Sequence, residues 1–264
     1  MKSLLKKVAI GFLPDSLLQK LKKIHYARKL RAISENDEPD LKVVKLLVGP
    51  GDCAVDIGAN IGVYTRCLSE SAGRSGQVYS VEPVDLTFDV LRSNVRKLKL
   101  ENVALINAAI SDSDGTVTME VPHYESGGEN FYEARITTAG SGGNLRRLTV
   151  PKRSVDSLFA EMPRRISLVK CDVEGHELNC IRGAARVIEK WHPAWLIEIG
   201  QDPDTPGTSA RQVFDELARS GYQAWWFDGA FLRKRAAGDS SSNYFFLTAD
   251  HLRIVQTKGF PVRE

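Results

Sequence analysis

Residues 55–62, VDIGANIG, decide the fold class of this chain. An apolar run contains the acidic residue Asp56, and glycines follow at Gly58 and Gly62, which is typical of a buried strand that turns tightly into a helix. A dinucleotide-binding turn has a glycine where this chain has Asn60, and it is uncharged so that backbone N–H groups can face a pyrophosphate. The charge of Asp56 favours a cationic ligand instead. The sulfonium and α-amino groups of S-adenosylmethionine meet that requirement.

A second acidic residue, Glu82, follows the next predicted strand, residues 77–81. It comes twenty residues after Gly62, close to the spacing at which an acid accepts hydrogen bonds from ribose hydroxyls. Pro83 cannot donate to a strand ladder, so we expect it to end the strand. Taken singly, Asp56 is equally consistent with a helix cap and Glu82 with a solvated loop. Together, at this spacing, they favour a ligand site.

Composition indicates one globular domain with extensions. The 264 residues are 42% hydrophobic and 26% charged, which is enough to bury a sizeable core. The four cysteines form no CxxC pair, so we expect buried free thiols in a reducing cytoplasm. No apolar run reaches eighteen residues, and the apolar run 8–13 is too short for a signal peptide. We therefore expect a cytoplasmic chain that is neither exported nor transmembrane.

Residues 1–40 are predicted to form a basic N-terminal arm ahead of a domain at 41–264. Residues 1–31 hold nine Lys or Arg against one acid, Asp15. Leu17, Leu21 and Ile24 recur at helical spacing, which predicts an amphipathic helix over 15–31. Such a helix can contact an anionic membrane from the cytoplasmic side, bind nucleic acid, or pack on the domain with its lysines in solvent. The sequence leaves these alternatives and the oligomeric state open.

The remaining pattern predicts a doubly wound α/β fold, a Rossmann-like sheet with helices on both faces. A helix is expected at 41–48. Strands are expected at 53–57, 77–81, 103–109, 167–172 and 194–199. A turn at 113–115 predicts a hairpin between the third strand and residues 116–121. Residues 126–143 and 201–208 are rich in Gly, Ser or Pro, and either segment is a candidate lid over an acceptor.

The densest group of ionisable residues is 168–177, LVKCDVEGHE. Ligands bind outside the carboxyl ends of strands in such sheets, so we expect Asp172 near the transferred methyl group. We interpret His176 as the base or acceptor-orienting residue, neutral because a helix N-terminus disfavours imidazolium, with Asp172 and Glu174 as its partners. Glu198 is expected to line the acceptor pocket. The alternative for Glu174 and Glu177 is helix capping.

Three blocks resemble the FkbM-type S-adenosylmethionine-dependent methyltransferases: residues 55–65, residues 81–83 with 107–112, and residues 169–177. The resemblance covers roughly residues 45–200 and implies a class I methyltransferase sheet. It places Asp56 and Gly58 at the methionine moiety, Glu82 at the ribose and Ala109 at the adenine. Donor-site residues predicted in full are Asp56, Gly58, Asn60, Gly62, Tyr64, Glu82, Pro83, Asn107, Ala109, Asp112 and Asp172. Either Asn107 or Asp112 is expected to supply the polar adenine contact.

The resemblance implies O-methylation of a sugar, glycan, lipid-linked or secondary-metabolite hydroxyl. The carboxylate spacing permits a divalent metal but does not require one. A nicotinamide-dependent oxidoreductase is disfavoured by Asp56 and the missing glycine. A nucleic-acid methyltransferase is disfavoured because basic and aromatic residues do not interleave. The aromatic residues at 225–231 predict a hairpin that pairs with 243–247, and core packing is favoured over stacking on sugar rings.

Overall fold

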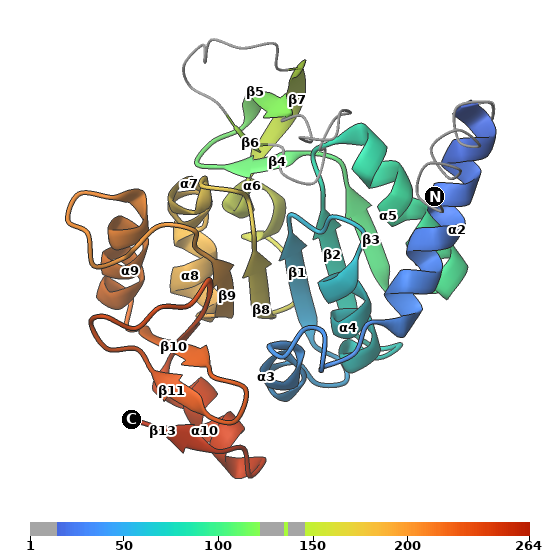
Figure 1. Ribbon diagram of the computed structural model, residues 1–264. Helices are drawn as coiled ribbons and strands as arrows, with labels where there is room; N and C mark the ends of the chain where they lie inside the picture. The colour runs from blue at the N-terminus through green and yellow to red at the C-terminus, as the bar shows by residue number, and fades with distance from the viewer. Residues whose placement is uncertain (1–14, 122–134, 137–145) are drawn as a thin grey trace, which may run out of the picture.

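The computed structural model describes residues 15–121, 135–136 and 146–264, and its main element is a large twisted sheet (Figure 1). Nine strands of this sheet lie within those residues. In spatial order they are β13 (Val262–Arg263), β11 (Leu232–Lys234), β10 (Gln223–Phe227), β12 (Asn243–Leu247), β9 (Ala194–Glu198), β8 (Ile166–Cys171), β1 (Cys53–Ile57), β2 (Gln77–Val81) and β3 (Val103–Ile106). The five strands β9, β8, β1, β2 and β3 are parallel. From β1 the chain adds β2 and β3 on one side, and it later adds β8 and β9 on the other side, so the strand order reverses between β1 and β8. The predicted doubly wound sheet is confirmed.

Helices cover both faces of this sheet because its central strands are apolar on both sides. Ala54 and Leu168 face one layer, while Val55 and Val169 face the other. The first layer contains α3 (Leu41–Leu47), α4 (Val63–Ala72), α5 (Asp85–Leu98) and α10 (Ala249–Thr257). The second contains α6 (Val155–Phe159), α7 (Glu177–Arg182), α8 (Ala185–Trp191) and α9 (Ser209–Arg219). None of the helices in the described ranges is long and apolar enough to cross a membrane.

The N-terminal helix α2 (Asp15–Ala32) runs along α5 (Figure 1). Its last turns pack on the domain through buried Ala27 and Leu30. The Arg31 guanidinium donates to the carbonyl of Lys97 in α5. Ile24, expected on the apolar face, is 44% exposed. The predicted helix is therefore present and its C-terminal end packs on the domain, but Ile24 does not lie on the buried face.

A second, smaller sheet lies beyond the carboxyl ends of β1 and β2 (Figure 1). Its strands, in spatial order, are β4 (Ala109–Ser111), β7 (Arg146–Ser154), β5 (Gly115–Val121) and β6 (Arg135–Ile136). The predicted hairpin between the segments before and after residues 113–115 is wrong, because β7 lies between β4 and β5 and pairs with both. The predicted strand 103–109 also breaks after Ile106, where the Asn107 amide donates to the carbonyls of Glu82 and Pro83.

The aromatic segment near the C-terminus forms the predicted hairpin. Strand β10 pairs antiparallel with β11 and with β12. Trp225, Tyr244 and Phe245 are fully buried, so these rings pack in the core rather than against a ligand. All four cysteines are buried and free. The predicted lid 126–143 lies outside the described residues apart from β6.

A close backbone contact joins the turn after β1 to the loop after β8. Gly58 has a φ of +72°, and a Cβ atom placed on it would lie 1.8 Å from the Asp172 carbonyl oxygen. The Asp172 N–H donates to the Ile57 carbonyl at 3.1 Å, and the N–H groups of Gly58 and Ala59 donate to the Val81 carbonyl at 3.0 Å. Only glycine allows this approach, since any side chain would push the two segments apart.

We expect Gly58→Ala to reduce the free energy of unfolding by about 2–5 kcal/mol, because it adds left-handed backbone strain and a clash with the Asp172 carbonyl. Gly207→Ala is the matched control. Gly207 also has a positive φ, +81°, but a Cβ atom placed on it would have no neighbour within 4 Å. Strain alone should cost it about 1–2 kcal/mol. Urea unfolding measures both, and equal losses would contradict the contact.

Candidate active site

The first cavity lies at the carboxyl edge of the large sheet, where the second sheet approaches it. Its space is about 580 Å³ when the part open to solvent is included. Six predicted site residues line it: Gly58, Asn60, Glu82, Pro83, Ala109 and Asp172. Glu174, predicted as catalytic, lines it too. Apolar walls come from Val81, Ile110, Met119 and Ile136. This combination suits a nucleoside, with a flat apolar part and a polar part.

Glu82 is held in this cavity by two backbone groups. The Asn60 N–H donates to Oε2 and the Val84 N–H donates to Oε1, each at 3.0 Å. Burial raises the pKa of Glu82 to about 7, although these hydrogen bonds oppose the rise. Each oxygen of an ionised carboxylate can accept more than one hydrogen bond. Glu82 can therefore accept from both hydroxyls of a ribose, as predicted from its spacing.

Asp56 is enclosed beside the same turn. It is fully buried, and its Oδ2 accepts from the Thr65 hydroxyl at 2.6 Å. Within the described part of the chain, Oδ1 has no hydrogen-bond partner. Burial raises the pKa of Asp56, and the nearby Lys170 ammonium opposes that rise. A buried carboxylate with one unpartnered oxygen is complementary to a cationic ligand, so these residues fit S-adenosylmethionine.

Asp56 and four other predicted donor-site residues do not line the first cavity. Gly62 begins α4 with a φ of +98°. The Tyr64 ring faces the buried Lys170. The Asn107 amide is used on the backbone after β2, and Asp112 is exposed and bonded to neighbouring serine hydroxyls. The structure therefore gives neither of the two predicted polar adenine contacts a place in the cavity wall.

A second cavity of about 650 Å³ adjoins the first, and Asp172 and Glu174 line both. Glu177, Glu198 and Gln201 are among its other lining residues. Glu174 has a φ of +54°, a conformation that costs a non-glycine residue about 1–2 kcal/mol. Such strain is often retained at functional sites. Asp172 and Glu174 thus lie at the junction of the two cavities.

Two further carboxyl groups of the second cavity differ in their surroundings. Glu198 ends β9 and is exposed to the cavity. Partial desolvation, followed by repulsion from Asp172, raises the pKa of Glu198 to about 7. Glu177 is buried, and its Oε1 accepts from the Gly175 N–H at 2.8 Å. Glu177 therefore bonds to the backbone of the loop before α7, while Glu198 is open to the second cavity.

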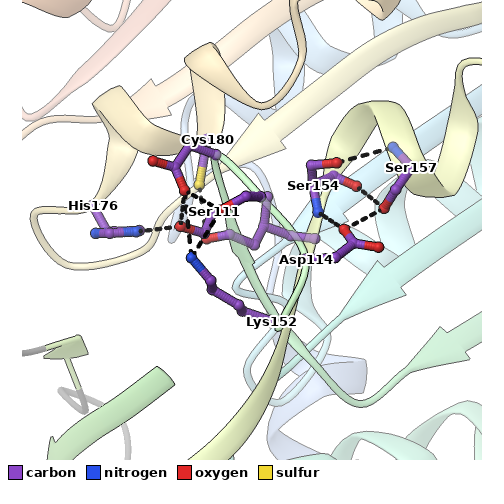
Figure 2. Close-up of polar contacts among 10 residues, drawn as sticks. Ser111, Asp114, Lys152, Ser154, Ser157, His176 and Cys180 are labelled. Carbon is purple, nitrogen blue, oxygen red and sulfur yellow. Dashed lines mark hydrogen bonds and ion pairs between the residues drawn. The ribbon is translucent and has the colours of Figure 1, made fainter. Parts of the chain in front are cut away.

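His176 lies apart from this group (Figure 2). Its Nε2 is 3.0 Å from the Ser111 hydroxyl at the end of β4, and it lines neither of the two cavities described above. Burial lowers the pKa of His176, so the imidazole is neutral at pH 7 as predicted. Figure 2 shows His176 pointing toward Ser111, and Lys152 of the second sheet also lies near Ser111. The structure brings Asp172, Glu174 and Glu198 together but places His176 elsewhere.

Sequence reasoning missed Lys170 and the second-sheet residues. Lys170 is 4% exposed, and its Nζ lies 2.9 Å from Asp172 Oδ2. A lysine within an otherwise apolar strand was the signal that could have identified it. Met119 and Ile136 gave no such signal, because their approach to the cavity depends on long-range strand pairing. Over the described ranges, no set of three or more His, Cys, Asp or Glu side chains is arranged to hold a metal ion.

We expect S-adenosylhomocysteine binding to release protons at pH 7, because ribose hydroxyls bind the ionised form of Glu82 and lower its pKa from about 7. Affinity should therefore rise with pH through this range. Calorimetry in two buffers of different ionisation enthalpy measures the release. Glu82→Gln should abolish it and weaken binding about 10- to 100-fold, since a charge-assisted hydrogen bond contributes about 1.5–3 kcal/mol. Asp112→Asn, outside the cavity, is the control; equal proton release in the Glu82 variant would contradict the assignment.

Comparison with known proteins identifies the family. Residues 56–224 match the sequence profile of the Methyltransferase FkbM domain. Over 200 residues the chain is 28% identical to the Hexuronic acid methyltransferase AglP of Haloferax volcanii, covering 73% of this chain and 74% of that protein. It is 26% identical over 178 residues to Methyltransferase sdnD of Sordaria araneosa, covering 54% and 67%. A solved structure of Methyltransferase FkbM from Methylobacillus flagellatus is similar with a TM-score of 0.48 and 17% identity, covering 74% of this chain and 43% of that one.

The profile match spans more than half of the chain and includes Asp56, Glu82, Asp172 and Glu198. The contacts of Glu82 with a ribose and of Asp56 with a cationic sulfur stay predictions; Glu82 lines the first cavity, whereas Asp56 is buried beside it. This chain belongs to the FkbM family of S-adenosylmethionine-dependent methyltransferases.

Proposed function

We propose that this methyltransferase acts on a hydroxyl group of a sugar or glycan. The observation that carries the proposal is the second cavity, which meets the donor cavity at Asp172 and Glu174 and is lined by carboxyl groups. Carboxylates accept hydrogen bonds from the several hydroxyls of a sugar. The similarity to a protein named for a hexuronic acid acceptor supports a sugar substrate. Family membership supports methyl transfer over the nicotinamide-dependent alternative.

The chain's own residues have two tasks in this reaction. Bound S-adenosylmethionine supplies a methyl group activated by the positive charge on its sulfur. Asp172 and Glu174 orient the acceptor hydroxyl at the junction of the cavities, and positioning of this kind supplies much of the rate in a displacement reaction. A base in the second cavity then receives the proton that the hydroxyl loses.

Glu198 is the residue that we assign as this base. It lies in the second cavity, and with a pKa of about 7 it is about half ionised at neutral pH, so it can both accept and release a proton there. His176, which the sequence favoured for this role, is neutral but faces Ser111. The placement of the two side chains favours Glu198 over His176 as the base.

We expect Glu198→Gln to lower kcat by about 10²- to 10⁴-fold at pH 7.5, because the variant cannot accept a proton. Donor affinity should stay unchanged, since Glu198 does not line the first cavity. In the unmodified protein kcat should rise with pH up to about 7 and then level off. His176→Gln is the matched control, and we expect less than about a threefold loss. A larger loss in the His176 variant than in the Glu198 variant would restore histidine as the base.

A methylation assay tests the acceptor class directly. The purified chain is incubated with S-adenosylmethionine and, separately, with neutral glycosides, uronic acids, lipid-linked glycans, small phenols and RNA. We expect S-adenosylhomocysteine to form with sugar acceptors, and the product to carry an O-methyl group. Methylation of phenols alone would indicate a secondary-metabolite enzyme, and methylation of RNA alone would overturn the proposal.

A lipid-linked glycan would reach this site most easily if the chain rests on an anionic membrane. The support is the excess of basic residues over 1–31. Replacing Lys2, Lys6, Lys7, Lys20 and Lys22 by Glu should weaken binding to phosphatidylserine vesicles at least tenfold at low salt, because each lysine contributes about 1 kcal/mol near an anionic surface. Sedimentation with vesicles measures the change. Equal binding of the variant and the unmodified chain would remove the membrane contact from the proposal.

A further inference from the structure

Lys170 of β8 is a buried cation at the centre of the site. Its side chain is 5% exposed, and Nζ lies 2.9 Å from Asp172 Oδ2. Nζ also lies 5.1 Å from the centroid of the Tyr64 ring. A carboxylate and an aromatic face are both favourable partners for an ammonium group. Lys170 is therefore held between an acid of the cavity wall and a ring of α4.

Strand register places Lys170 beside the acids of both cavities. It lies opposite Asp56 in the pairing of β1 with β8. In the pairing of β8 with β9 it lies opposite Leu196, two residues before Glu198. Because alternate residues of a strand share a face, Asp56, Lys170 and Glu198 lie on the same face of the sheet. Deeper on this face the residues are apolar, so Lys170 marks the boundary between core and active site.

Charged and titratable groups reach Lys170 from every element around it. They are Asp56 of β1, Tyr64 of α4, Glu82 after β2, Asp172 after β8, Glu198 of β9 and Glu38 of the segment before α3. Burial by itself would lower the pKa of Lys170, but the carboxylates of Asp172 and Asp56 outweigh burial and raise it. Lys170 is therefore a cation at neutral pH and does not serve as the base.

We propose that Lys170 is the positioning residue of the reaction centre: it holds the Asp172 carboxylate at the junction of the two cavities and balances the buried acids around it. The effect on catalysis rests on the proposed role of Glu198. Lys170 favours the ionised form of Glu198, whereas Asp172 opposes it. Removing the Lys170 charge should therefore raise the pKa of Glu198, and removing the Asp172 charge should lower it.

The first test uses the full chain without any ligand. Urea unfolding is measured at pH 6 and pH 8 for the unmodified chain, Lys170→Met, Lys170→Arg and the double variant Lys170→Met/Asp172→Asn. Without its ammonium group the buried carboxyls bind protons more tightly in the folded state than in the unfolded state, so stability falls as pH rises. We expect the unfolding midpoint of Lys170→Met to drop more between these pH values than that of the other three proteins.

Two results of this unfolding series would overturn the proposal. One is a Lys170→Met midpoint that changes with pH as the unmodified chain does. The other is that neither Lys170→Met nor the double variant folds at pH 6 or pH 8. That result would indicate that the lysine serves packing alone.

The second test is the pH profile of kcat, measured with an acceptor that the unmodified chain methylates. We expect its midpoint to move up by about one pH unit in Lys170→Met and down in Asp172→Asn, and to return near the original value in the double variant. Lys170→Arg, which keeps the charge, should leave it in place. A lysine that only stabilises the fold would move none of these midpoints, and that result would overturn the proposal. If the unmodified chain methylates no acceptor, the proposed function fails, while the unfolding series still decides the role of Lys170.

Discussion

The contact between the Gly58 backbone and the Asp172 carbonyl oxygen governs the geometry of the whole site. It brings the turn after β1 against the loop after β8, at the place where the order of the parallel strands reverses. Ligands bind at such switch points because the two connections leave in opposite directions and open a crevice between them. Asp172, which makes the contact, and Glu174 two residues later both line the first and the second cavity.

The site also depends on charges that the fold keeps away from water. Asp56 and Lys170 are almost completely buried, and Glu82 is 5% exposed. Burying charged groups costs free energy unless partners compensate for the lost water. The partners are specific: backbone N–H groups for Glu82, the Thr65 hydroxyl for Asp56 and a carboxylate for Lys170. Because these hydrogen bonds are present without a ligand, they orient the carboxyl groups in advance, which is the condition for electrostatic preorganisation.

The second sheet contributes residues to the cavity wall and to the surroundings of His176. It provides Met119 and Ile136 to the wall of the first cavity and presents Ser111 to His176. Consequently, His176, which lies only four residues after Asp172 in the chain, bonds to Ser111 and lines neither cavity. The segment after β3 pairs with β7 of the second sheet as β4, so strand β3 of the large sheet ends at Ile106.

The sequence by itself determined the strands 53–57 and 77–81, the strand that ends at Glu198, the paired acids Asp56 and Glu82, and the methyltransferase family. It could do so because strand, turn and glycine signals are local, and parallel strands bring their carboxyl ends to one edge. Only the tertiary structure decided that β7 lies between β4 and β5, that His176 lies outside both cavities and that Lys170 bonds to Asp172 at their junction. These outcomes depend on hydrogen bonds and register between segments far apart in the chain, and no local pattern encodes such pairings.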